Sequence, residues 1–130
     1  MLIKLESNKR PIVKVNVNNK EAYMLIDTGA SLGVIDSNQL KDYNLEKYRK
    51  LSTTVVGVGG KEQNAYDLRP YILDIEGIKL HQFATFDLSS VVDSIKRETN
   101  IKILGVIGTL QIKMSEMKID LDNNQILLGY

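Results

Sequence analysis

Short apolar stretches separated by turn-forming residues constrain the fold of this chain more than any other feature. Val13, Val15 and Val17 alternate with polar residues, which is the pattern of a half-buried strand. The segment 18–20, which holds two Asn residues, then offers turn chemistry because Asn tolerates positive φ angles. An apolar run over residues 23–26 follows it. This arrangement predicts an early β-hairpin.

The rest of the chain has the same strand-rich character. Further strands are expected over residues 53–58, 66–75, 78–86, 117–121 and 125–128, with a turn at 122–124. No repeat, low-complexity tract or linker divides the 130 residues, a length that fits one compact domain. The sequence therefore predicts a mostly all-β fold, organised as a single domain over residues 1–130.

Helices are expected to be few and short. One is expected over residues 37–43 and a second over 91–99, where Ser90 and Asp93 match a capping box. A third is expected after Gly108, with Leu110 and Met114 on one face. The predicted fold therefore contains two or three short helices.

Charge and residue counts exclude several classes of function. Lys plus Arg number 17 and Asp plus Glu number 16, and the densest basic run (Lys47, Arg49 and Lys50) is brief. We interpret that run as solvated surface and expect no nucleic-acid partner. The chain has no Cys, which excludes disulfides, thiolate nucleophiles and Cys-based zinc sites. The single His81 is interpreted as a polar residue on a strand, since it cannot anchor a metal cluster alone.

Membrane insertion is not expected either. The longest apolar stretch, residues 103–110, contains two glycines and is far too short to span a bilayer. The first eleven residues turn polar by Lys4 and lack the hydrophobic region of a signal peptide. We therefore expect a cytoplasmic location if the chain is complete, and export if a targeting segment has been removed.

The residues most informative about chemistry begin at Asp27, which directly follows the apolar run. A charge in such a place costs several kcal/mol unless it is compensated. Gly29 and Ala30 lack side-chain bulk, so another backbone or a ligand can approach closely. Thr28 and Ser31 bring hydroxyls that can fix the surroundings of the carboxylate by hydrogen bonding. The pattern predicts a functional carboxylate, and the alternative is a helix-cap or turn aspartate in an unrelated β-protein.

The sequence Asp-Thr-Gly-Ala-Ser after apolar residues resembles the active-site signature of aspartic peptidases. Its single copy in a short chain is similar to the retropepsin-like, single-domain homodimeric branch of that family, of bacterial type. The resemblance implies a closed acid-protease β-barrel with Asp27 as the catalytic residue. It also implies that Thr28 helps to lock two active-site loops together. Gly29, Ala30 and Ser31 would complete a loop that offers backbone groups to an extended substrate.

A second element strengthens the resemblance. In the family, an apolar-apolar-Gly element leads into a helix and packs across the catalytic loop, and Val106, Ile107 and Gly108 match it. Retroviral members carry Arg after this Gly, whereas this chain has Thr109 there and Ser31 opposite. A hydroxyl pair is expected to replace the charged brace. Ile107, Gly108 and Thr109 are accordingly expected to support the site.

A third element is rich in glycine. Gly57, Val58, Gly59 and Gly60 lie between strand-like stretches, as expected of a hairpin tip. By resemblance this is the flap that closes over a bound peptide, since glycines at a hinge absorb large backbone changes easily. The alternative is a phosphate-cradling loop, but no Lys-Ser/Thr pair or helix start follows in P-loop fashion.

The resemblance implies a two-chain mechanism. Peptide hydrolysis of this kind needs two carboxylates about 3 Å apart that share one proton, and the chain has a single Asp-Thr-Gly. A homodimer with Asp27 facing its symmetry mate would supply both carboxylates and act as an endopeptidase on a peptide or protein. The nucleophile is water, so no metal or cofactor is implied. Four other aspartates are expected to be caps, strand ends or surface charges: Asp36, Asp87, Asp120 and Asp122.

Apolar substrate subsites are expected from Val34, Val56, Val58 and Val106. The alternative function keeps the fold and drops the catalysis, leaving a silent dimerisation or peptide-binding module. The missing charged residue after Gly108 favours that alternative, whereas the intact Asp-Thr-Gly favours the enzyme.

Overall fold

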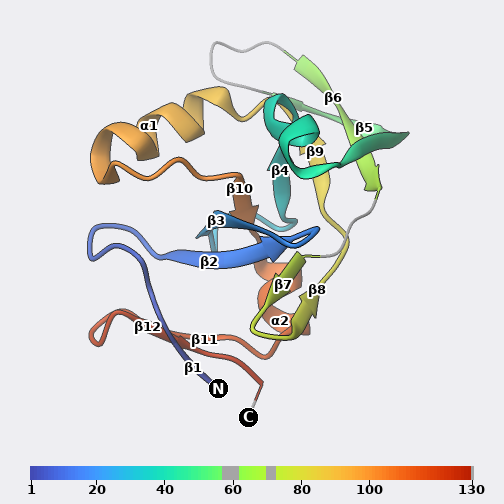
Figure 1. The fold of residues 1–130 in the computed structure, drawn as a ribbon. Coiled ribbons are helices and arrows are strands. Elements are labelled where there is room, and N and C mark those ends of the chain that lie inside the picture. The colour runs from blue at the N-terminus through green and yellow to red at the C-terminus, as the bar shows by residue number, and fades with distance from the viewer. Residues whose placement is uncertain (57–61, 70–72, 130) are drawn as a thin grey trace.

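The structure is a computed structural model that describes residues 1–56, 62–69 and 73–129, without the side chains of 53–56 and 62 (Figure 1). The expected flap residues Gly57, Val58, Gly59 and Gly60 lie outside the described residues. The strands are β1 (Leu2–Lys4), β2 (Ile12–Val17), β3 (Lys20–Ile26), β4 (Val34–Asp36), β5 (Glu46–Val56), β6 (Glu62–Arg69), β7 (Leu73–Ile75), β8 (Ile78–Leu80), β9 (Ala84–Phe86), β10 (Gly105–Ile107), β11 (Lys118–Asp120) and β12 (Gln125–Leu127).

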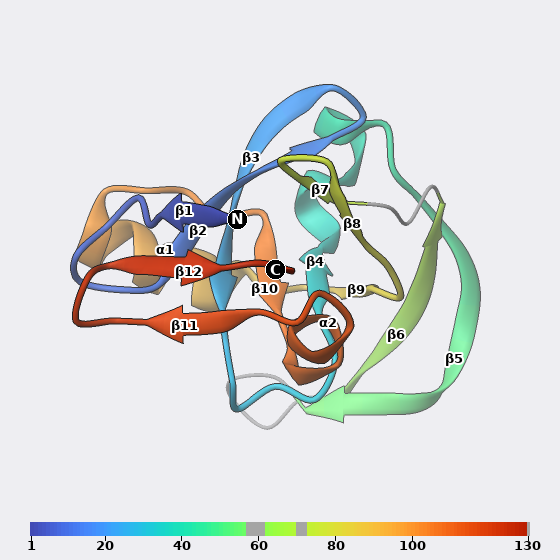
Figure 2. The same ribbon diagram turned by 90° about the horizontal axis from the view of Figure 1, so that it is seen from below.

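These strands form two sheets. Nine strands lie in the order β5-β6-β9-β4-β10-β3-β2-β7-β8, and β1, β12 and β11 form a smaller sheet. β2 and β3 pair antiparallel through Asn18 and Asn19, whose φ angles are 51° and 65°. The early hairpin is therefore confirmed, with Asn in the positive-φ positions of its turn. The smaller sheet lies beside both chain termini, away from the β5–β6 hairpin (Figure 2).

The mostly-β class is confirmed, but the expected closure into a barrel is not found among the described residues. The nine-stranded order begins at β5 and ends at β8, and no pairing in the described part of the chain joins these two strands. Closure needs tilted strands with a continuous stagger, whereas β4, β7, β8, β9 and β10 have three residues each. β2 meets β7 at one residue pair, Asn16 with Asp74. Over the described residues, the sheet therefore does not close into a barrel.

The expected helices all form. They are the 3-10 helix η1 (Ser37–Tyr43), α1 (Ser89–Thr99) and α2 (Thr109–Met114). The capping box predicted at Ser90 and Asp93 is wrong, because α1 begins at Ser89 and has no side-chain bond at its N-cap residue. Asp87, which precedes the helix, accepts a hydrogen bond from the Ser89 amide at 2.8 Å through its Oδ1. The Asp87 carboxylate therefore bonds the first turn of the helix in place of the expected Ser90 hydroxyl.

The core consists of two hydrophobic clusters. The larger one gathers one face of the β2–β3 hairpin together with β7, β8 and β12. In the smaller one, Val92 and Ile95 on one face of α1 cluster with the preceding Leu88, Val34 of β4 and Val106 of β10. Each buried side chain of this kind stabilises the fold by roughly 1.5–3 kcal/mol. α1 thus covers one face of the central strands (Figure 1).

Candidate active site

The position of Asp27 follows from the pairing of β3 with β10. These strands are parallel neighbours, with Ile26 opposite Ile107. The carboxyl ends of parallel strands meet at one edge of a sheet, so Asp27 and Gly108 leave the sheet side by side. The Asp27 amide donates to the Ile107 carbonyl at 2.9 Å, which extends the pairing by one residue.

The Asp27 carboxylate lies within an open turn. Its Oδ1 accepts a hydrogen bond from the Gly29 amide at 2.9 Å, and the Ala30 amide donates to the Asp27 carbonyl at 3.2 Å. Asp27 is half-buried, whereas Thr28 and Gly29 are exposed. A Cβ atom on Gly29 would lie 3.2 Å from Asp27 Oδ1, which is a tight contact. The turn therefore keeps the carboxylate in place and leaves it accessible.

Gly108 lies directly under the loop that Asp27 begins. A Cβ atom at residue 108 would lie 2.6 Å from the Leu32 carbonyl carbon and 2.9 Å from the Ala30 carbonyl oxygen. The amides of Thr109 and Leu110 donate to the carbonyls of the loop, the first to Ala30 at 2.8 Å. A glycine is required here because two backbones cross in contact.

The expected hydroxyl pair between Thr109 and Ser31 does not form. Thr109 Oγ1 instead donates to the backbone carbonyl of Ser31 at 3.3 Å, and the Leu110 amide donates to the same carbonyl at 3.1 Å. Ser31 is exposed, so its hydroxyl has no need of a protein partner. The brace in this chain is therefore made from one side chain and the backbone of the loop.

Sequence reasoning missed Gln111, a buried polar residue of α2 that contacts the same loop. Its Oε1 accepts from the amides of Gly33 at 2.9 Å and Gly108 at 3.2 Å. The pattern of α2 drew attention to Leu110 and Met114, but Met114 is exposed and the buried positions are Gln111 and Ser115. The Gln at a core-facing helical position is the signal that could have identified it.

The comparisons with known proteins agree with this geometry. The family model described as gag-polyprotein putative aspartyl protease matches residues 13–106, more than half of the chain, and the match includes the Asp-Thr-Gly turn. The chain belongs to this family. The match ends before Gly108, so the placement of this glycine against the aspartyl protease turn is a finding of the structure.

Solved structures extend the likeness to the whole fold. The chain is similar to the retroviral protease-like domain of Ddi1 from Leishmania major, at 14% identity and a TM-score of 0.57, over 98% of this chain and 89% of that one. It is also similar to a retropepsin-like aspartic protease from Rickettsia conorii, at 15% identity and a TM-score of 0.60, over 100% and 89%. No curated protein matches the sequence. The resemblance to retropepsin-like aspartic proteases, including a bacterial one, is confirmed, and at these identities the structural likeness shows the fold.

Two of the four valines expected to line substrate subsites of this aspartyl protease fold, Val34 and Val106, are buried. Val34 is 7% exposed and Val106 is 5% exposed, because both pack in the cluster beneath α1. The half-buried side chains at the border of that cluster include Leu25, Ala30 and Val91. Of these, Leu25 and Ala30 flank Asp27 in the sequence. The side chains of residues 56 and 58 lie outside the described part of the structure.

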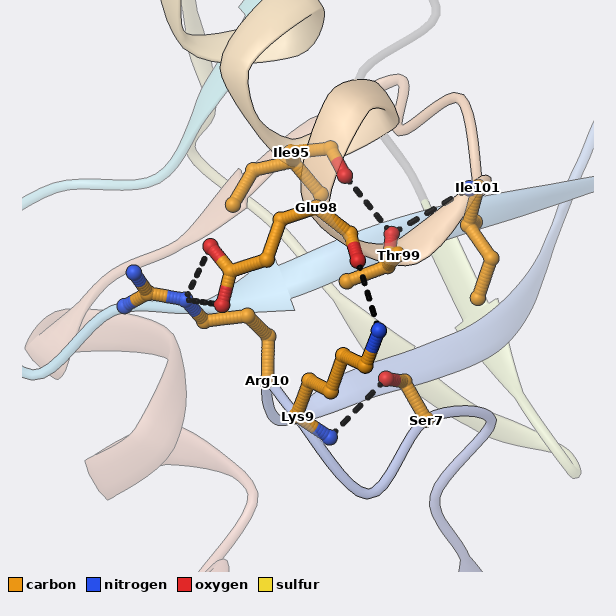
Figure 3. A network of polar contacts seen from close by, with 7 residues as sticks. All are labelled: Ser7, Lys9, Arg10, Ile95, Glu98, Thr99 and Ile101. Carbon is orange, nitrogen blue, oxygen red and sulfur yellow. Dashed lines mark hydrogen bonds and ion pairs between the residues drawn. The ribbon is translucent and has the colours of Figure 1, made fainter.

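Polar contacts hold α1 in place at both ends. At its C-terminal end, Arg10 Nε lies 3.0 Å from both carboxylate oxygens of Glu98, and Lys9 Nζ donates to the Glu98 carbonyl at 3.2 Å (Figure 3). At its N-terminal end, Gln63 of β6 exchanges two hydrogen bonds with the backbone of Asp87, at 2.9 and 3.0 Å. The Arg10–Glu98 pair is exposed, so it is worth less than about 1 kcal/mol. The buried apolar face supplies most of the adhesion.

The expected structural roles of three other aspartates are confirmed. Asp36 caps η1 by accepting from the Asn38 amide at 3.2 Å. Hydrogen bonds from Ser89, and after these one from Asn38, lower the pKa of Asp87 below its ordinary value. The side chain of Asn123 lowers the pKa of Asp120 in the same way. These carboxylates serve helix and turn ends.

A groove of about 480 Å³ opens beside the Asp27 loop. Leu32 of the loop borders it, and two arginines from β5 and β6 line it. Arg49 forms an ion pair with Asp67 at 2.8 Å, and Arg69 stacks on the Tyr48 ring at 3.5 Å from the ring centre. The groove is thus bordered by the apolar Leu32 of the Asp27 loop and by stacked and ion-paired side chains of β5 and β6.

No cluster of three or more His, Asp or Glu residues able to hold a metal ion occurs within 1–56, 62–69 and 73–129. His81, which lies between β8 and β9 rather than on a strand, is half-buried. No helix among the described residues is long and apolar enough to cross a membrane.

Proposed function

We propose that this chain is an aspartic endopeptidase whose active centre forms when two copies bring their Asp27 carboxylates together. The observation that carries the proposal is that the Asp27 carboxylate makes few hydrogen bonds and lies in an exposed turn. Among the described residues it accepts a side-chain hydrogen bond from Gly29 alone, and the turn around it is exposed. Membership of the aspartyl protease family supports a catalytic role for this accessible carboxylate.

We propose that the second carboxylate comes from another copy of the chain. Asp36 is 2% exposed and its oxygens are occupied by donors from η1 and from Leu88. Asp87 and Asp120 are engaged at the ends of a helix and a turn. A two-fold axis that passes beside the Asp27 turn would place two identical carboxylates together. The exposed Thr28 is proposed to contact its symmetry mate there.

The chemistry of such a pair follows from electrostatics. Two carboxylates about 3 Å apart share one proton, because both cannot stay ionised at that distance. The ionised member takes a proton from a water molecule, whose oxygen attacks the carbonyl carbon of the peptide bond. The protonated member donates to the carbonyl oxygen and stabilises the charge that develops on it. Proton transfer to the leaving nitrogen then completes the hydrolysis.

The substrate is proposed to be a peptide in extended form, bound along the loop from Gly29 to Leu32. The Ala30 amide and carbonyl already bond within the molecule, to Asp27 and Thr109. We therefore propose that the Gly29 carbonyl, rather than the Ala30 backbone, makes the main hydrogen bond to the substrate. Ser31 stands next in the loop, beside the groove that Leu32 borders.

The test is cleavage of a mixed peptide library by wild type and by Asp27→Asn at acidic and at neutral pH. Asp122→Asn, which changes an exposed turn aspartate, is the matched control. We expect wild type and the control to cleave the same peptides and Asp27→Asn to cleave none. Cleavage that survives in Asp27→Asn would exclude the mechanism. A cleaving sample that light scattering shows to be strictly monomeric at the assay concentration would exclude the two-chain site.

A further inference from the structure

Gln111 makes more contacts than a surface glutamine of a short helix would need. Its side chain is fully buried, at 0% exposure. Its Oε1 accepts from the amides of Gly33 and Gly108, at 2.9 and 3.2 Å. Its Nε2 donates to the carbonyls of His81 and Gln82, at 2.9 and 3.1 Å. A carboxamide has two acceptor sites and two donors, so its capacity is fully used.

The four partner groups belong to three separate segments. Gly33 ends the loop that begins at Asp27, Gly108 lies under that loop, and the two carbonyls precede β9. The Gly33 carbonyl also accepts from the Ala84 amide at 3.0 Å, which ties the loop to the start of β9. The amide of Gln111 is therefore the point at which the Asp27 loop, the Gly108 turn and the segment before β9 are joined.

The space around this joint is filled. A Cβ atom on Gly33 would lie 2.5 Å from the Phe83 ring and 2.9 Å from Gln111 Oε1. Leu32, Gln82 and Phe83 all line the groove beside the loop. Removing the carboxamide would leave buried amides and carbonyls without partners, and such groups move to find new ones. The loop and the groove wall would move together.

We propose that Gln111 is a positioning residue, which holds the Asp27 loop and the groove wall at residues 82–83 in the geometry that peptide cleavage requires. This inference rests on the proposed peptidase function. Cleavage needs two Asp27 carboxylates at a fixed short separation, so a small displacement of each loop acts twice in a symmetric dimer. A misplacement of about 1 Å lowers catalytic rates by about 100-fold.

The main test compares Gln111→Met with Gln39→Met, using a peptide that wild type cleaves. Gln39 is a matched control because it is also buried, at 5% exposure. Its Nε2 donates to Asp36 Oδ2 and to the Ile103 carbonyl, both at 3.0 Å, on the α1 side of the molecule. Both variants are expected to lower Tm. Only Gln111→Met is expected to lower kcat, by about 10- to 100-fold, with KM changed by less than about threefold. Equal kcat losses in both variants, or none in Gln111→Met, would overturn the proposal.

A pH profile of Gln111→Glu separates positioning from general stability. The introduced carboxyl group, when protonated, accepts from the two amides and donates to one carbonyl. When ionised, it has no donor left and places a negative charge against the carbonyls of His81 and Gln82. The ratio of its kcat to that of wild type should therefore rise as the pH falls from 7 to about 4. A flat ratio over that range contradicts the assignment. This variant also serves if Gln111→Met does not fold.

Amide hydrogen exchange tests the joint without any cleavage. The Gly33 and Gly108 amides should exchange at least about tenfold faster in Gln111→Met than in wild type, and at the wild-type rate in Gln39→Met. Unchanged exchange overturns the positioning role whatever the activity. Faster exchange in Gln111→Met, together with a wild-type protein that cleaves no peptide, would keep the joint and reject its catalytic consequence, so the two failures are distinguishable.

Discussion

Asp27 and Asp36 end neighbouring parts of the same sheet and are used in opposite ways. Asp27 follows β3, is half-buried, and accepts a hydrogen bond from Gly29. Asp36 ends β4, is 2% exposed, and accepts from Asn38, Gln39 and Leu88. An aspartate at the end of a strand has a structural role when several hydrogen-bond donors surround its carboxylate, as at Asp36. It is a candidate catalytic residue when it has few donors and lies close to solvent, as at Asp27.

The difference lies in what each carboxylate is bonded to. Asp36 joins η1, the start of α1 and the end of β4, so its loss affects packing over much of the molecule. Asp27 is held by a local turn, and the Gly108 turn and Gln111 hold the loop instead. We infer that stability and catalysis are separated between the two aspartates, which leads to four predictions.

The largest effect on stability is expected for Asp36→Ala. The substitution removes the acceptor of the buried donors of Gln39 and Leu88 and of the part-buried Asn38 amide, at about 1–3 kcal/mol for each group left unpaired. The free energy of unfolding should fall by about 3–5 kcal/mol, measured by urea denaturation. Asp122→Ala, at an exposed turn, is the control. A decrease in the free energy of unfolding below about 1 kcal/mol would mean that water replaces Asp36 as the acceptor of these donors. Asp36 would then not be the structural counterpart of Asp27.

A smaller loss is expected for Gly108→Ala. The added methyl group meets the backbone of Leu32 and Ala30, which cannot move without displacing the Asp27 loop. The free energy of unfolding should fall by about 1–3 kcal/mol, and peptide cleavage should fall with it. Gly77→Ala is the comparison, since a Cβ there meets nothing within 4 Å and only its positive φ of 90° is strained. Loss of cleavage in Gly77→Ala as well would show that the effect is not local to the loop.

A pH-dependent effect is expected for Asp87→Asn. Its hydrogen bonds to Ser89, and after these to Asn38, lower the pKa of Asp87 in the folded chain below the ordinary 3.8. The stabilisation is therefore fully present above about pH 3.8 and is lost as the pH falls through the lower folded value. At pH 7 the variant should have a Tm about 2 °C below wild type. That difference should shrink below pH 3.8, and a constant difference down to pH 2 would disprove the role.

The smallest effect on stability is expected for Asp27→Asn, despite its complete effect on cleavage. The amide oxygen can still accept from the Gly29 amide, so the turn is preserved. The free energy of unfolding should stay within about 0.5 kcal/mol of wild type, measured at a concentration where the chain is monomeric. A loss comparable to that of Asp36→Ala would show that Asp27 is a structural residue, and the proposed division would be wrong.

Local sequence patterns predicted the parts of the fold that depend on neighbouring residues. The alternating valines of β2 and the two Asn residues of its turn specify the hairpin, and all three helices form where they were expected. Element ends were less well predicted: β5 begins seven residues earlier than expected, at Glu46, and β1 was not expected at all. Pairing with a distant strand decides such ends, since β1 pairs with β12.

The candidate site shows the same division. The sequence by itself determined the Asp27 turn and the family of the chain, and its resemblance to that family drew attention to Gly108. The tertiary structure decided that Thr109 bonds to a backbone carbonyl and that α1 packs over Val34 and Val106. It also decided that the sheet does not close over the part of the chain that the structure describes. It further decided the contacts of Gln111, which lies 78 residues from its partner Gly33. Periodicity and turn chemistry act over a few residues, whereas the burial and bonding of a side chain depend on which distant segments fold against it.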